Sequence, residues 1–444
     1  MPTCLSKLQF QKLLAGLKSP NAKIAKLYPG EGQDLQPIHT VYGGAQLFKL
    51  NTCQKIGDLA YHHFETYLAS AFDLQECFNL PDYVLAKTVH SRVRERLQHQ
   101  AVEDFRIDFE DGYGHRPDNE EDDSAEFAAR EVARGMRENT LSPGIGIRIK
   151  TLSEELKHRA IRTLDLFVTT LVKEAKGELP PRFVITLPKI TSVGQVKVFV
   201  QTLEAIEKAN KLKPGTLRLE FMVEVPQSIL DPTGRAVLPE FLTAAKGRCV
   251  AAHFGTYDYT ASVNITAEHQ TMDHPACDFA KEVMKVSLAG TGIWLSDGAT
   301  NIMPVGPHKD PKSDHEKKEN REAIFQAWRT SYSHIRHSLK NGFYQGWDLH
   351  PGQLPVRYVA LYIFFLQSLG PASTRLKNFI EKAAQATLVG DVFDDAATGQ
   401  GLLNYFLRAL NCGAISEAQI LETGLTSEDI RLRSFKKILD VRTR

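Results

Sequence analysis

Two carboxylates, Glu224 and Asp258, each stand where a short β-rich run of the sequence ends. Carboxylate oxygens that have neither cysteines nor clustered histidines beside them favour Mg²⁺, which commonly takes one or two carboxylates together with waters and substrate oxygens. If the two runs form neighbouring strands, their side chains can converge on one ion. We therefore expect Glu224 and Asp258 to bind Mg²⁺, or Mn²⁺ in its place. The alternative is that they form structural ion pairs with Arg148 or Lys189.

Two cations belong to other β-rich runs, since Arg148 lies on the run Gly146–Ile149 and Lys189 follows the run Phe183–Leu187. The guanidinium of Arg148 is a planar fork that matches a substrate carboxylate, a geometry that lysine cannot reproduce. A metal ion chelated by a 2-keto acid would polarise its carbonyl and stabilise the enolate that forms when a carbon–carbon bond breaks. The residue types together predict a site for a small 2-keto or 2-hydroxy acid whose carboxylate is held by Arg148.

Three further residues are candidates for substrate contact, and each has a structural alternative. Gly43 and Gly44 follow the first β-rich run, where a missing side chain would let a substrate carboxylate approach the backbone, although a tight turn explains the glycines as well. His350 precedes a proline and could donate to the substrate or order the water around a metal ion. A histidine at such a place can equally stabilise a turn.

Eight β-rich runs alternate with longer runs of helical spacing, for example at residues 152–176, 193–209 and 316–339. This alternation predicts a parallel sheet closed into a (β/α)8 TIM barrel. Right-handed crossovers then place the carboxyl ends of all strands on one rim, where this fold carries its chemistry. The strands are expected at Ile38–Tyr42, Phe105–Phe109, Gly146–Ile149, Phe183–Leu187, Leu217–Val223, Cys249–Phe254, Gly292–Leu295 and Phe343–Leu349.

Three regions follow from this pattern. Residues 1–37 form an N-terminal extension with a helical start and a loop rich in Gly and Pro, and residues 38–369 form the TIM barrel catalytic domain. Residues 370–444 have helical spacing throughout, and we expect them to form a lid or an oligomerisation segment.

The composition excludes several classes of protein. Lys+Arg number 54 and Asp+Glu 53, so the basic excess of a nucleic-acid-binding surface is missing. The six cysteines are widely spread without a CxxC pair, which indicates reduced thiols and a cytoplasmic location. The most apolar stretch, Tyr358–Leu366, is about half the ~20 residues needed to span a bilayer, so we expect a buried helix and no membrane association.

At the ends of these β-rich runs, the sequence resembles the citrate lyase β-subunit/malyl-CoA lyase family, which belongs to the pyruvate- and phosphoenolpyruvate-utilising barrels. The resemblance covers residues 38–360 and depends on the order and spacing of several short motifs. These are Asp108-Phe-Glu110-Asp111 after strand two, Arg148 on strand three, Leu187-Pro188-Lys189, the metal-binding positions Glu224 and Asp258, and Leu349-His350-Pro351-Gly352-Gln353.

What the resemblance implies is a Mg²⁺-dependent carbon–carbon lyase or aldolase, with Arg148 and Lys189 in catalysis and Glu110 and Asp111 in substrate binding. It also implies a homo-oligomer, because in CoA-ester lyases of this family an aspartate of the C-terminal segment serves as acid/base in a neighbouring subunit. Asp394 is the counterpart here. The alternative is that Asp394 caps the next helix.

The chain departs from the family pattern close to the expected substrate. Val225-Pro-Gln-Ser-Ile follows Glu224 where the family usually has a glycine, and Val41-Tyr-Gly-Gly-Ala-Gln46 replaces the strand-one signature. A CoA thioester and a free acid therefore both stay open as substrates, as for a divergent member of the family. Two other functions also stay open, a phosphoenolpyruvate- or pyruvate-utilising phosphotransferase on the same barrel and a non-catalytic keto-acid-binding protein.

Overall fold

The computed structural model describes residues 4–441 except 31, 33, 382–386, 390–391, 395, 435–436 and 439–440. Eight parallel strands make one sheet in which each strand from β1 to β6 pairs with the next along the chain and β1 also pairs with β8. A bridge between Ser296 and Gln345 and the hydrogen bond from the Asp297 amide to the Gln345 carbonyl (2.9 Å) complete the ring. The strands are β1 (His39–Gly44), β2 (Asp104–Asp108), β3 (Gly144–Arg148), β4 (Phe183–Leu187), β5 (Arg218–Val223), β6 (Cys249–Phe254), β7 (Trp294–Ser296) and β8 (Gly346–Asp348). The predicted (β/α)8 barrel is confirmed.

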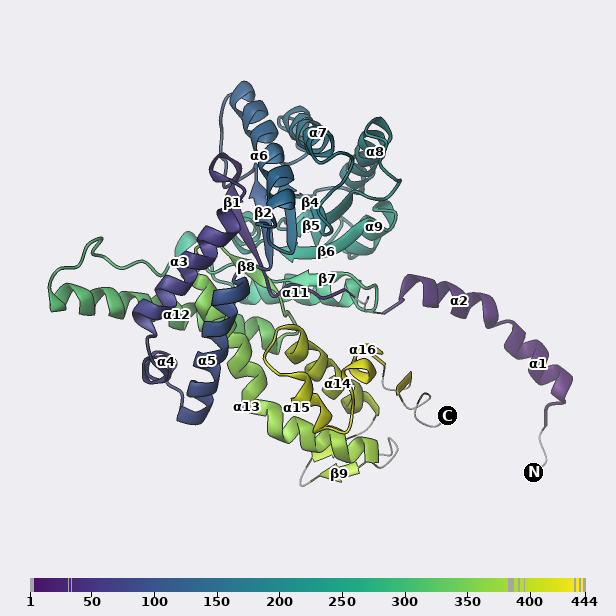
Figure 1. The fold of residues 1–444 in the computed structure, drawn as a ribbon. Helices are drawn as coiled ribbons and strands as arrows, with labels where there is room; N and C mark the ends of the chain where they lie inside the picture. The colour runs from purple at the N-terminus through teal and green to yellow at the C-terminus, as the bar shows by residue number, and fades with distance from the viewer. Residues whose placement is uncertain are drawn as a thin grey trace.

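Helices surround the barrel, and three of them lie between β1 and β2, where the chain has its longest insertion (Figure 1). These three are α3 (Thr52–Tyr67), α4 (Ala71–Phe78) and α5 (Tyr83–Gln100). The helices after β2 to β8 are α6 (Asp118–Glu138), α7 (Lys157–Glu174), α8 (Val193–Ala209), α9 (Leu238–Ala244), α10 (Thr256–Ser262) with α11 (Pro275–Leu288), α12 (Asp314–Lys340) and α13 (Gln353–Glu381).

Helix α8 illustrates why these segments fold as they do. Ser192 accepts a hydrogen bond from the Gln195 amide and so caps the first turn. Val196, Phe199, Val200 and Leu203 recur at helical spacing and are buried against the sheet. Burying each such side chain stabilises the fold by about 1.5–3 kcal/mol, so the apolar stripe fixes which face of the helix meets the barrel.

Charged side chains fill the middle of the barrel. Side chains alternate along β2, so that Phe105 and Ile107 join the hydrophobic core while Arg106 points across the barrel to β5. Its Nε and Nη2 donate to the two carboxylate oxygens of Glu220 at 2.7 and 2.8 Å, and His253 lies 3.1 Å from the same carboxylate. The barrel centre is thus a paired ionic layer that separates its two mouths.

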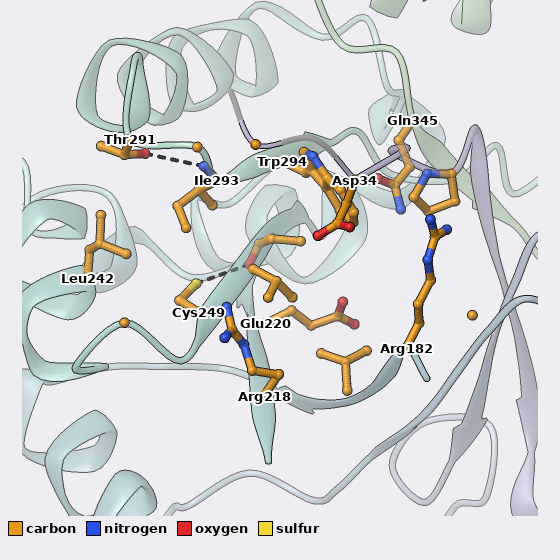
Figure 2. A pocket seen from close by; sticks show the side chains of 18 of the residues that line it. Asp34, Arg182, Arg218, Glu220, Leu242, Cys249, Thr291, Ile293, Trp294 and Gln345 are labelled. Atoms are coloured by element: carbon orange, nitrogen blue, oxygen red, sulfur yellow. Dashed lines mark hydrogen bonds between the residues drawn. The ribbon is translucent and has the colours of Figure 1, made fainter. Parts of the chain in front are cut away.

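A cavity of about 1260 Å³ enters the barrel from the mouth where the strands begin (Figure 2). Its inner end reaches Arg106 and Glu220, and its entrance is lined by Arg182, Arg218 and Trp294. This mouth lies opposite the rim on which the sequence analysis placed the chemistry.

The C-terminal helices gather beside the second half of α13 (Figure 1). Helix α13 runs without a break across the predicted domain boundary at residue 369. Beyond it come the two short strands β9 (Thr387–Val389) and β10 (Val392–Asp394), then α14 (Ala396–Asn411), α15 (Glu417–Leu421) and α16 (Ser427–Arg431). Arg408 on α14 donates to Gln36, which precedes β1, so this region lies at the mouth where the strands begin.

The N-terminal extension contains two short helices, α1 (Lys7–Ala15) and α2 (Lys18–Leu27), which bury no residue and project from the body (Figure 1). The apolar stretch Tyr358–Leu366 is inside α13 and mostly buried. Within the described part of the chain, we find no helix whose length and hydropathy would let it cross a membrane.

Candidate active site

A smaller cavity of about 350 Å³ opens at the carboxyl ends of the strands. It takes side chains from the ends of several strands, among them Tyr42 from β1, Arg148 from β3, Glu224 after β5, Asp258 on α10 and Trp347 from β8. Arg148, Glu224 and Asp258, three of the residues predicted from the sequence, are therefore brought to one place.

Asp108 and Arg148 form the floor of this cavity as a buried pair. The Nε and Nη2 of Arg148 donate to the two oxygens of Asp108 at 2.7 and 2.5 Å. Asp108 also accepts the amides of Glu110 (3.0 Å) and Gly112 (2.7 Å). Burial raises the pKa of Asp108, but Arg148 and these amides outweigh it and hold the pKa below its ordinary value. The forked edge that the sequence analysis assigned to a substrate carboxylate is thus bonded to Asp108.

The remaining nitrogen of Arg148 and the ammonium of Lys189 meet two more carboxylates. Arg148 Nη1 lies 3.1 Å from Glu110 and 3.4 Å from Asp111. Lys189 Nζ lies 2.6 Å from Glu110, 3.4 Å from Asp111 and 3.2 Å from Asp258. The ion pair between Asp258 and Lys189 is the one named as the structural alternative in the sequence analysis.

Lys189 has left-handed backbone geometry (φ +48°), which is uncommon for a residue with a side chain. Its amide donates to Glu224 at 2.9 Å while its ammonium reaches Glu110. Backbone strain of this kind costs on the order of 1–3 kcal/mol and persists where the surroundings hold it. Here it aims both ends of one residue at the carboxylate cluster.

Glu224 is buried and fits closely under the turn that follows β6. A Cβ on Gly255 would lie 2.5 Å from the Glu224 Cβ and 2.6 Å from its Oε2, so only glycine leaves room for this carboxylate. Burial first, and then the charge of Glu110, raise the pKa of Glu224 well above its ordinary value. Burial and Asp111 likewise raise the pKa of Glu110, despite its contacts with Arg148 and Lys189.

The cluster is short of positive charge. Five carboxylates share two cations, which leaves an excess of three negative charges when all are ionised; the carboxylates are Asp108, Glu110, Asp111, Glu224 and Asp258, and the cations are Arg148 and Lys189. Among the residues that the structure describes, no three His, Cys, Asp or Glu side chains are close enough together to hold a metal ion by themselves. Glu224 and Asp258 nevertheless fit Mg²⁺, since this ion takes one or two carboxylates and completes its shell with water and substrate.

The predicted glycines and His350 have separate surroundings. Gly44 lines the cavity and packs against the Gly112 carbonyl, whereas a Cβ on Gly43 would point into the ring of Phe105. His350 Nδ1 accepts the Gly352 amide at 3.0 Å, within the turn that begins α13, and the cavity lining does not include it. Its turn-stabilising role is therefore the one that the structure describes.

Asp394 ends β10, and only its backbone belongs to the described part of the chain. Helix α13 begins just after β8 at the carboxyl rim and has 29 residues, a length of about 43 Å. Strand β9, which pairs with β10, contacts α13, and Figure 1 shows it at the far end of this helix. Asp394 is thus remote from the carboxyl rim of its own barrel. The neighbouring Asp395 lies outside the described residues.

Tyr42 also lines the site, although its role could not be predicted from the sequence. Its ring lies under the Arg148 guanidinium, 5.0 Å from the ring centre, and against Trp347 at 4.8 Å. Its buried hydroxyl has no hydrogen-bond partner among the described residues. A buried hydroxyl without a partner is costly, so this one is available to a ligand in the cavity. The signal in the sequence was an aromatic residue in the place of the family's strand-one signature.

The comparisons with known proteins agree with the fold. The family model described as "Domain of unknown function (DUF6986)" matches residues 17–438, and no curated protein matches the chain significantly. A citrate lyase from Burkholderia xenovorans LB400 superposes with a TM-score of 0.56 at 17% identity, covering 87% of this chain and 96% of that one. This similarity confirms the expected resemblance to citrate lyase barrels at the level of fold.

Two weaker structural similarities were found as well. CitE from Mycobacterium tuberculosis, in complex with magnesium, acetoacetate and coenzyme A, gives a TM-score of 0.48 at 13% identity, covering 85% of this chain and 99% of that one. Malate synthase from Haloferax volcanii gives 0.46 at 14% identity, covering 91% and 99%.

Proposed function

The chain belongs to the family described as a domain of unknown function, DUF6986, and we propose that it is a divalent-metal-dependent carbon–carbon lyase or aldolase. Its substrate would be a small 2-keto or 2-hydroxy acid, as the free acid or the CoA thioester. The observation that carries this proposal is the excess of carboxylates over cations in the rim cavity, most of which a divalent cation would neutralise. The fold shared with a citrate lyase supports it only as an analogy.

Glu224 and Asp258 would hold Mg²⁺, or Mn²⁺ in its place, with Lys189 withdrawing from Asp258. When bound, the ion supplies a Lewis acid that polarises the keto oxygen of the substrate. Gly255 keeps the space for the Glu224 carboxylate, and the Lys189 amide fixes its Oε1. Both contacts orient the carboxylate toward the cavity.

Arg148 and Lys189 would provide the positive charge for the substrate carboxylate and for the negative charge that develops in the reaction. Asp108 positions Arg148, so the substrate would meet the Nη1 side of the guanidinium in competition with Glu110 and Asp111. Burial lowers the pKa of Lys189, but Glu224 and Glu110 outweigh this and raise it above its ordinary value. Lys189 therefore acts by charge, and another group must transfer the proton.

Asp394 of a second subunit is our proposed acid/base. Its distance from the rim of its own barrel requires a homo-oligomer in which β10 of one subunit approaches the rim of another. Gly44 and Glu110 would border the substrate, while His350 holds the turn beneath it.

The decisive experiment measures Mg²⁺ binding by calorimetry and metal-dependent turnover of 2-keto and 2-hydroxy acids. Asp258→Ala should reduce Mg²⁺ affinity at least about 100-fold, as expected when one of two ligating carboxylates is lost. Asp165→Ala, an exposed carboxylate on α7, is the matched control and should bind as the wild type does. Unchanged binding by Asp258→Ala would remove the metal site. Binding without turnover of any such acid would instead indicate a keto-acid-binding protein.

The role of Asp394 has its own test. Asp394→Asn should lower turnover by about 100-fold or more and leave Mg²⁺ binding intact, because only a proton-transfer group is lost. Mixing Asp394→Asn subunits with Asp258→Ala subunits should restore part of the activity, since a mixed pair contains one complete site. Full activity in Asp394→Asn would reduce this residue to a structural role.

A further inference from the structure

The N-terminal arm, residues 4–30 with helices α1 and α2, carries a continuous apolar stripe that the molecule leaves uncovered. Phe10, Leu17 and Ile24 recur every seven residues, and Leu13, Leu14 and Leu27 lie beside them at helical spacing. All six side chains are exposed, and neither helix has a buried residue. Gly16 and Leu17 keep right-handed helical geometry between the two helices, so the stripe passes from α1 to α2 on one face.

The arm is also strongly basic. Residues 1–30 contain five lysines and no Asp or Glu; these are Lys7, Lys12, Lys18, Lys23 and Lys26. Taking these five from the 54 Lys and Arg of the chain leaves 49 against 53 Asp and Glu, so the rest of the molecule has a net charge of −4. Arm and body are therefore of opposite charge, as two complementary binding surfaces are.

The base of the arm is fixed at the mouth where the strands begin, and Lys26 and Leu27, at the end of α2, border the large cavity there. The Gly30 amide donates to the Gly290 carbonyl at 2.8 Å, and Tyr28 packs beside Gly290 just after α11. From that point α2 and then α1 lead away from the body (Figure 1). The stripe is thus presented at a defined place and away from its own barrel, a geometry that suits exchange between two molecules.

We propose that the arm docks on the body of a second copy of this chain, its apolar stripe against that surface and its lysines among the acidic residues around it. The helices have 9 and 10 residues and together are about 28 Å long and about 10 Å wide. Two arms exchanged by symmetry would bury roughly 1,100 Å² when both surfaces are counted, close to the lower limit of about 1,200 Å² for a stable interface. Such a dimer depends on protein concentration and weakens with salt.

The test compares two leucines on opposite faces of α1 in the full-length protein. Leu14 belongs to the stripe, whereas Leu8 is 75% exposed on the opposite face. Sedimentation equilibrium over micromolar to hundred-micromolar concentrations should show a dimer for the wild type. Leu14→Glu should raise its dissociation constant at least about tenfold because a charge enters the apolar contact. Leu8→Glu should change it less than about twofold.

A monomeric wild type, or equal dimerisation of Leu14→Glu and wild type, overturns the proposal. Neither substitution removes a buried side chain, so loss of folding does not complicate the result. A vesicle assay with phosphatidylcholine and phosphatidylserine in a three-to-one ratio tests the alternative that the arm binds a membrane surface. Vesicle binding that Leu14→Glu abolishes, with dimerisation unchanged, would assign the arm to a membrane surface and overturn the second-copy contact.

Discussion

Glu220 and Glu224 are four residues apart, both buried and both directed into the barrel, yet their surroundings are opposite. Glu220 receives two hydrogen bonds from Arg106 and contacts His253 and Thr186. Burial raises its pKa, but Arg106 and His253 outweigh this and hold the pKa well below the ordinary value. Glu224 receives one backbone amide and lies near two other carboxylates, and its pKa is raised well above the ordinary value.

This contrast separates the part of the barrel that holds the fold together from the part able to bind a ligand. The large cavity ends at the paired layer, where the carboxylates of Glu220 and Asp104 both accept hydrogen bonds from the Arg106 guanidinium. The small rim cavity is lined by Glu224, whose charge is not balanced. Uncompensated buried charge is costly, and proteins keep it mainly where a ligand supplies the balance. Charge balance, more than volume, locates the candidate site.

The largest effect on stability is expected from a substitution in the paired layer of Arg106 and Glu220. Glu220→Gln removes the carboxylate that accepts from both Nε and Nη2 of Arg106 and leaves this buried guanidinium paired with Asp104 alone, which should lower the free energy of unfolding by about 3 kcal/mol. Urea denaturation at neutral pH measures this difference. Mg²⁺ binding by the folded fraction should be retained. A loss below about 1 kcal/mol would mean that the ionic layer is hydrated and that the two glutamates are not in opposite surroundings.

The same substitution at Glu224 should have the opposite sign. Because folding raises the pKa of Glu224, the folded state holds its proton more tightly, and the metal-free protein loses stability as pH rises from about 4.5 through the raised pKa. Glu224→Gln removes this charge, so the melting temperature of the metal-free protein at pH 7.5 should rise by roughly 1–3 °C. Scanning fluorimetry with and without Mg²⁺ measures it.

The variant should also lose the stabilisation that Mg²⁺ gives the wild type. A lower melting temperature for Glu224→Gln across the whole pH range would contradict the assignment of Glu224 as an unbalanced carboxylate. Equal Mg²⁺ stabilisation of variant and wild type would exclude Glu224 as a ligand.

Strand positions and the rim residues could be predicted from the sequence because both depend on local patterns. All eight predicted runs contain or overlap an observed strand, and the charged residues that follow them reach one rim because parallel strands share a direction. The bidentate contact of Arg148 with Asp108 could not be predicted. It depends on the spacing of β2 and β3 in the closed barrel and on the glycine at 112, which leaves room for the carboxylate.

Helix ends were harder because packing overrides local preference. Residues 370–444 were expected to form a separate segment, and Pro371 lies inside α13, where a proline costs about 3 kcal/mol. Helix α13 nevertheless continues, because Ala372, Leu376 and Phe379 bury a second apolar stripe against the C-terminal helices. The first helical part of this segment therefore belongs to α13, and Thr387 begins β9.

The smallest effect is expected at Tyr42, between the balanced layer and the unbalanced rim. Tyr42→Phe keeps the ring against Trp347 and beneath Arg148 and removes only the hydroxyl that lacks a partner. The ligand-free protein should keep or gain stability, by up to about 1 kcal/mol, because a buried unsatisfied group is lost. Affinity for a 2-keto acid such as pyruvate in the presence of Mg²⁺ should fall about tenfold, the value of one hydrogen bond in a buried site.

Tyr113→Phe is the matched control. The Tyr113 hydroxyl bonds to Ser124 at 3.0 Å, and the residue does not line the cavity, so this variant should lose stability without losing ligand affinity. If Tyr42→Phe bound pyruvate as tightly as the wild type, the hydroxyl would not contact the ligand, which would then be held by the charged residues of the rim alone.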